Sequence, residues 1–121
     1  MAKLDFLLIQ YENGPGYQIT FIKQTEDGKL KYRCHQFGYV DSGADEWIYT
    51  DIDAESWTNK LERLLMSWKP DYVDLSVIDG WRYRIDCRID DSYAQCYDMC
   101  NMTPKNFDKF NDLIRMLKKD F

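Results

Sequence analysis

The sequence predicts an α+β fold: a two-layer domain with a mainly antiparallel sheet of about six strands and two helices on one face of it. Two observations lead to this prediction. Apolar and polar residues alternate over several segments of strand length, and three such segments precede each of two segments with helical spacing. The chain therefore follows a βββα-βββα pattern in a single domain, 1–121, with pseudo-repeat units at about 3–69 and 71–121.

The first unit is expected to contain strands at 4–11, 17–23 and 29–37, with turns where glycine follows a polar residue. A longer connection, 38–52, follows, in which 47–49 suits a further short strand. Asp53 is a good N-cap for a helix from Ala54 to about Trp68, and Pro70 stops that helix because the residue before a proline disfavours helical geometry. The apolar stripe of this helix is Trp57, Leu61, Leu64, Leu65 and Trp68.

The second unit carries the clearest alternation in the chain, from Trp81 to Asp90, where every second residue is apolar and the others are charged. We expect a strand at 72–78 to pair with it through an Asp79-Gly80 hairpin, and a third strand at 93–100 to follow. Thr103 as N-cap and Pro104 at the first helical position predict the second helix. Its apolar stripe is Phe107, Phe110, Leu113, Ile114 and Leu117.

Composition excludes several classes of protein. Hydrophobic residues make up 45% of the chain, which is too many for a disordered protein. No apolar run approaches the length of a membrane-spanning helix or of a signal-peptide core, so we expect a cytoplasmic protein with no membrane contact. The net charge of −5 is ordinary for a soluble domain, and the distribution of that charge is more informative.

Acidic and aromatic residues gather in the long connection before the first helix. Between Asp41 and Glu55 there are six acids and no base. Aromatic side chains supply contact area and charge supplies steering, so this pattern is typical of an interaction surface. The sequence predicts a non-enzymatic inhibitor or adaptor that occupies a basic, nucleic-acid-binding type of surface on a partner protein. The predicted contact residues are Asp41, Asp45, Glu46, Trp47, Tyr49 and Asp51.

Nucleic-acid binding is the alternative function. If the apolar residues of two alternating strands face the core, then six basic residues share the opposite face: Lys29, Lys31, Arg33, Arg82, Arg84 and Arg88. Asp86 and Asp90 on the same face also allow simple cross-strand charge pairing. The overall acidity of the chain ranks nucleic acid below a protein partner.

A small-molecule or zinc site is the third hypothesis, because the chain has four cysteines and one histidine. Cys34 and His35 are adjacent on a predicted strand and point to opposite faces, while Cys96 and Cys100 lie roughly 13 Å apart along another strand. These spacings favour buried, reduced cysteines. We therefore expect no cofactor, no metal and no catalytic residues.

The stretch from Asn101 to Phe110, which follows an alternating strand and opens a helix with a proline, resembles small uncharacterised bacterial α+β domains. The resemblance covers 77–121 and implies a fold without an activity. In size and acidity the chain is also similar to small phage or mobile-element proteins that inhibit host defence nucleases. That likeness implies an anti-defence inhibitor and assigns no residue a role.

Overall fold

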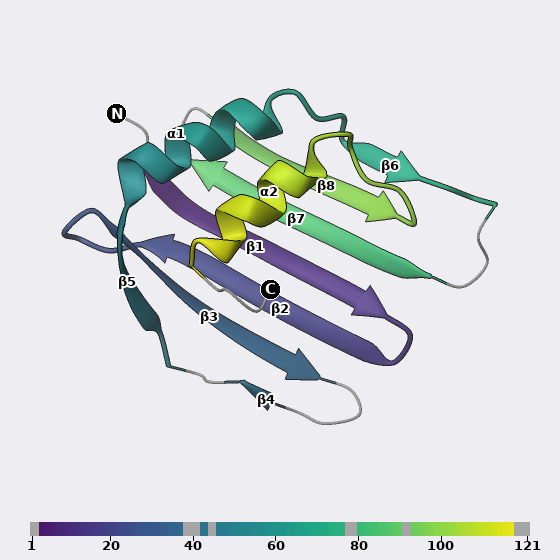
Figure 1. Ribbon diagram of the computed structural model, residues 1–121, viewed down its shortest axis with the longest axis horizontal. Helices are drawn as coiled ribbons and strands as arrows, with labels where there is room; N and C mark the ends of the chain where they lie inside the picture. The colour runs from purple at the N-terminus through teal and green to yellow at the C-terminus, as the bar shows by residue number, and fades with distance from the viewer. Residues whose placement is uncertain (1–2, 38–41, 44–45, 77–79, 91–92, 118–121) are drawn as a thin grey trace.

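A large, mainly antiparallel sheet forms the frame of the molecule. In the computed structural model, which describes residues 3–37, 42–43, 46–76, 80–90 and 93–117, seven strands run in the order β4-β3-β2-β1-β7-β8-β6, and β5 pairs with β3 beside this path (Figure 1). The strands are β1 Leu4–Asn13, β2 Gly16–Gln24, β3 Lys29–Phe37, β4 Ser42–Gly43, β5 Ile48–Asp53, β6 Asp71–Val73, β7 Trp81–Ile89 and β8 Tyr93–Cys100, and the helices are α1 Ala54–Leu65 and α2 Phe107–Arg115.

The α+β class with a mainly antiparallel sheet and two helices is confirmed. The expected number of about six strands is too low, because the connection between β3 and α1 contributes both β4 and β5. Both strands pair with β3: β4 lies beside the end of β3, and β5 lies beside the start of β3. The chain therefore runs back along the edge of the sheet from β4 to β5.

Both helices lie in front of the sheet in the view of Figure 1. The indole Nε1 of Trp57 in α1 donates to the carbonyl oxygen of Leu113 in α2 at 2.9 Å. The Tyr97 hydroxyl of β8 donates to the Leu65 carbonyl at 2.8 Å, and the ring of Tyr83 lies 5.2 Å from that of Phe107. We call the sheet face that makes these contacts the inner face and the opposite one the outer face.

The hydrophobic core lies between the helices and the inner face. The strict alternation predicted for 81–89 is confirmed, because Ile85, Cys87 and Ile89 are buried while Arg82 and Arg84 are exposed. The helices contribute the two largest fully buried side chains, Trp57 and Phe110. Burial of such aromatic side chains is the main source of stability in a domain of this size.

Helix α1 begins where the sequence predicts. The backbone N–H of Ser56 donates to the carboxylate of Asp53 at 3.0 Å, which satisfies one of the unpaired donors of the first turn. The helix ends at Leu65, three residues before the expected Trp68. The chain continues in turns, in which the N–H of Trp68 donates to the Leu65 carbonyl, so Trp68 remains buried.

The predicted start of the second helix is wrong. Thr103 and Pro104 precede α2, which begins at Phe107 after a turn closed by the Phe107 N–H on the Pro104 carbonyl. Asn106 occupies the N-cap position, but its side chain makes no cap bond. Its Oδ1 accepts instead from Trp68 Nε1 at 2.7 Å, so the start of α2 is set by contact with the end of α1.

The predicted hairpin between 72–78 and β7 is also wrong. Strand β6 pairs in parallel with β8 and has no pairing with β7. Both edges of β7 are already occupied, by β1 on one side and β8 on the other, so β6 can only extend the sheet beyond β8. Asp79 of the expected turn lies outside the described residues.

Gly80 precedes β7 at a point of close approach. A Cβ atom on Gly80 would lie 1.6 Å from Oδ1 of Asn101, and this oxygen accepts a hydrogen bond from the N–H of Trp81 at 3.0 Å. We expect Gly80→Ala to displace the Asn101 amide and to lower the free energy of unfolding by about 1–2 kcal/mol, the value of one partly buried hydrogen bond.

Urea denaturation of a double-mutant cycle with Asn101→Ala tests this mechanism. Once the amide is absent, Gly80→Ala has nothing to displace and is expected to cost under about 0.5 kcal/mol. Equal costs in both backgrounds would show that the penalty belongs to the backbone at position 80 rather than to the contact with Asn101.

Candidate binding surface on the outer face of the sheet

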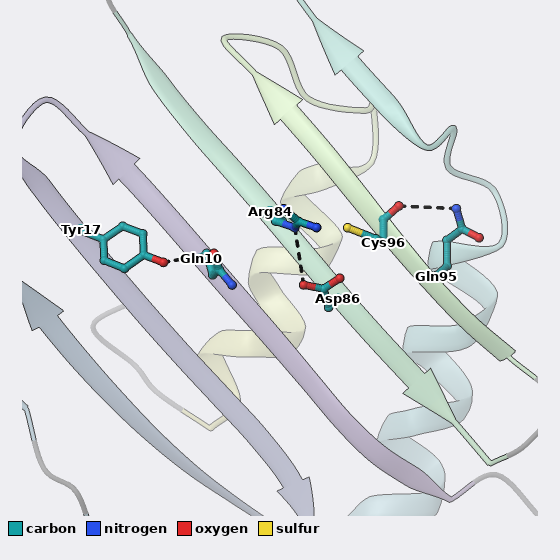
Figure 2. A network of polar contacts seen from close by, with 6 residues as sticks. All are labelled: Gln10, Tyr17, Arg84, Asp86, Gln95 and Cys96. Atoms are coloured by element: carbon teal, nitrogen blue, oxygen red, sulfur yellow. Dashed lines mark hydrogen bonds and ion pairs between the residues drawn. The ribbon is translucent and has the colours of Figure 1, made fainter.

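The outer face of the sheet carries side chains that no described helix covers. Figure 2 looks onto this face, with the helices behind the sheet. Gln10 and Tyr17, from neighbouring strands, point toward the viewer, and the Tyr17 hydroxyl donates to Gln10 Oε1 at 3.1 Å. Residues that pair across neighbouring strands lie on the same face of the sheet. Leu8 pairs with Phe21, and Phe21 pairs with Arg33, so all three lie on the outer face.

The acidic and aromatic segment predicted from the sequence is placed only in part. Asp41 and Asp45 lie outside the described residues. Glu46 and Asp51 are exposed, and Tyr49 in β5 has 67% of its surface exposed. Trp47 is half-buried because it packs on the sheet, with its ring 5.6 Å from that of Phe21. The two aromatic residues therefore lie against the outer face.

Trp47 and Tyr49 meet the basic residues of β3. The Lys31 ammonium lies 4.7 Å from the Trp47 ring centroid and 5.8 Å from that of Tyr49. The Arg33 guanidinium lies 4.8 Å from the Trp47 ring and 5.6 Å from the Phe21 ring. Such contacts are favourable by about 0.5–1 kcal/mol each at exposed sites. We define the aromatic–cation cluster as Phe21, Lys23, Lys31, Arg33, Trp47 and Tyr49; Lys23 joins it with its ammonium 5.8 Å from the Phe21 ring.

The three cations of this cluster are not neutralised by nearby carboxylates. Among the described residues, no ion pair involves Lys23, Lys31 or Arg33. Their charges are instead held over aromatic rings, which leaves them available to an anionic group from outside. The cluster thus combines positive charge and ring surface on a sheet face that neither described helix covers.

The remaining basic residues of the predicted nucleic-acid face lie elsewhere on the sheet. Strands β2 and β1 separate β3 from β7, which carries Arg82, Arg84 and Arg88. Arg84 forms an ion pair with Asp86, drawn as a dashed line in Figure 2, at 3.8 Å, and Arg88 lies 3.4 Å from Asp5. Arg82 pairs in register with Glu12, and Lys29 with Asp53. The six basic residues therefore fall into two groups. The register partners of Lys31 and Arg33 on β3 are Lys23, Tyr49 and Phe21, none of which is a carboxylate, whereas the other four lie opposite or beside carboxylates.

Sequence reasoning missed Phe21 and Lys23. The available signal was that β2 carries apolar residues on both faces: Ile19 and Phe21 lie on the outer face, and Ile22 lies on the inner one. A strand covered on one face alone normally alternates apolar with polar residues. The apolar residues on the outer face of β2 therefore indicated a second contact surface, and the contact of Phe21 with Trp47 now identifies it.

The cysteines lie in several separate places. Cys34 accepts from Thr20 Oγ1 and Gln18 Nε2 on one face of β3, while His35 stacks on Phe37 on the other, as their adjacent positions imply. Burial, followed by a hydrogen bond to Asp86, raises the pKa of the Cys96 thiol. Within the described part of the chain, no three His, Cys, Asp or Glu residues gather in an arrangement that could hold a metal ion.

No family model matches the chain, and no curated protein matches it. Neither helix in the described part of the structure has the length and apolar character needed to cross a membrane.

Proposed function

We propose that the chain is a non-enzymatic binding module, an inhibitor or adaptor that occupies a basic surface of a partner protein in the cytoplasm. The contact is made by β5 and the residues just before it. The observation that carries this proposal is that one sheet edge exposes apolar and acidic side chains together. Ile48 and Tyr49 have 47% and 67% of their surfaces exposed, beside the exposed carboxylates of Glu46 and Asp51.

The position of β5 supports a binding role. One side of β5 pairs with β3, and no described strand pairs with its other side. An edge strand presents backbone donors and acceptors that a partner strand can use, and neighbouring side chains supply specificity. The carboxylates would steer a basic partner toward this edge, and Tyr49 would supply a large buried contact once the complex forms.

A charge-reversal experiment tests the proposal. The tagged protein is used to capture partners from a nuclease-treated lysate of the source cells at low salt, and mass spectrometry identifies them. We expect the wild type to retain one protein in stoichiometric amount and Glu46→Lys/Asp51→Lys to lose it. Retention should also weaken as salt shortens the Debye length to about 8 Å at physiological ionic strength.

A matched control separates the surface from the net charge. Asp71→Lys/Asp108→Lys introduces the same change in charge at exposed positions on β6 and α2, and is expected to retain the partner. If the charge-reversed β5 variant still binds the same protein, or if the two double variants lose it equally, this contact surface is not the one used.

A further inference from the structure

The aromatic–cation cluster combines two features that bind nucleic acid strands. Trp47 lies within 6 Å of both Lys31 and Arg33, and its ring packs against that of Phe21, which in turn lies 6.2 Å from the ring of Phe6. Aromatic rings on a sheet offer surfaces on which unpaired bases stack, and an arginine guanidinium can stack on a base as well. Lysine side chains beside the rings reach the phosphates.

We propose that the aromatic–cation cluster binds single-stranded nucleic acid. The ligand is a strand with unpaired bases on a phosphate backbone, and RNA and DNA share this chemistry. The proposal goes beyond the protein-binding function, because it depends on Phe21, Lys31 and Arg33 rather than on the carboxylates beside β5. Its failure would therefore leave the proposed protein contact untouched.

Charge complementarity favours a single-stranded nucleic acid as the ligand of the outer face. Lys23, Lys31 and Arg33 form no ion pair with any described carboxylate, so phosphates would neutralise charges that the fold leaves available. The exposed ring of Tyr49, 5.8 Å from the Lys31 ammonium, places a stacking surface beside a cation. By contrast, the ion pairs of Arg84 with Asp86 and of Arg88 with Asp5 make the β7 side of the sheet a poor phosphate site.

The size of the cluster limits the affinity and sets its dependence on salt. Three cations imply about three phosphate contacts, and for single strands the slope of log K against log salt is then about −2. Glu46 and Asp51 border the cluster, and the net charge of −5 repels a polyanion at long range. We therefore expect binding that is clear at low salt and weak at physiological salt.

Fluorescence anisotropy with labelled oligouridylate and oligothymidylate of about 15 nucleotides tests the proposal on the full chain. We expect saturable binding with a slope near −2, and a loss of at least tenfold in affinity for Lys31→Gln/Arg33→Gln, with a slope reduced to about −0.7. Tyr49→Leu should weaken binding by about fivefold or more without changing the slope, because it removes stacking alone. A preference between the two oligonucleotides identifies RNA or DNA as the source.

Arg82→Gln/Arg84→Gln is the matched control, because it also removes two positive charges from the outer face, but from β7 instead of β3. It is expected to bind within about twofold of the wild type. Circular dichroism confirms that each variant is folded.

Three results would overturn the proposal. The first is the absence of an anisotropy change at the lowest salt. The second is an equal loss of affinity in the two double variants, which would mean that only the net charge matters. The third is equally tight binding of duplex DNA or of polyglutamate, which would make the cluster a general site for polyanions, including acidic proteins.

Discussion

Replacing Trp57 by alanine is expected to lower the free energy of unfolding by about 3–5 kcal/mol. Only 1% of the Trp57 surface is exposed, and its indole is the one hydrogen-bond donor that links α1 to the backbone of α2 among the described bonds. The substitution leaves a large cavity between the helices and the sheet. It also leaves the Leu113 carbonyl without this donor at a buried position, which adds to the cost.

Urea denaturation followed by circular dichroism measures this loss. Met66→Ala is a suitable control because Met66 closes the same helix and has 67% of its surface exposed, so its truncation should cost under about 0.5 kcal/mol. Since small domains are stable by only about 5–15 kcal/mol, Trp57→Ala is expected to leave a protein close to its unfolding threshold. A cost similar to that of Met66→Ala would contradict the role of Trp57 in joining the helices.

The second large effect is a loss of stability at alkaline pH. Burial, with a smaller contribution from the charge of Glu62, raises the pKa of the Cys87 thiol to about 12, against 9.0 for an ordinary cysteine. Below pH 9 the thiol is protonated in both the folded and the unfolded chain, and its contribution is constant. Between pH 9 and about 12 the unfolded chain ionises and the folded one does not, so the free energy of unfolding falls by up to about 1.4 kcal/mol per pH unit, or about 4 kcal/mol in total.

The measurement is a series of urea denaturations from neutral pH into this range, for the wild type and for Cys87→Ala. The variant has a lower stability at neutral pH, because it loses buried volume, but a shallower decline above pH 9. Some decline remains, since burial also raises the pKa values of Tyr93 and Tyr97. Met66→Ala, which removes no ionisable group, is the control and should decline as the wild type does. Parallel curves for Cys87→Ala and the wild type would contradict the assignment to Cys87.

Local signals in the sequence predicted the elements whose partners are close in the chain or whose faces differ sharply. The alternation over 81–89 identified β7 and its buried face, and Asp53 identified the start of α1, because an N-cap acts on backbone groups only two or three residues away. The predicted start of α2 was wrong because the helix start depends on a contact between residues far apart in the chain. Asn106 bonds to Trp68, which is 38 positions away, and no local rule describes that contact.

The candidate surface shows the same division. The sequence identified Trp47, Tyr49, Lys31 and Arg33, but assigned the aromatic residues to one site and the basic residues to another. Whether they meet depends on β5 folding back against β3, a pairing that the sequence suggests only as a short apolar run. Nothing in the sequence indicated that β7 pairs with β1. Because β1 occupies one edge of β7, the predicted hairpin with β6 cannot form.

The pairing of β1 with β7 has a consequence for the way the chain reaches its native state. The partners lie between 68 positions apart, for Asn13 and Trp81, and 85 apart, for Leu4 and Ile89. Contacts at such separations require the closure of a long loop and are associated with slow folding. During synthesis, one edge of β1 stays unpaired until β7 has left the ribosome, and such an edge can pair with other chains. Truncation after α1 is therefore expected to yield aggregates. In the complete fold, β7 from the second half of the chain covers the edge of β1 and prevents this association.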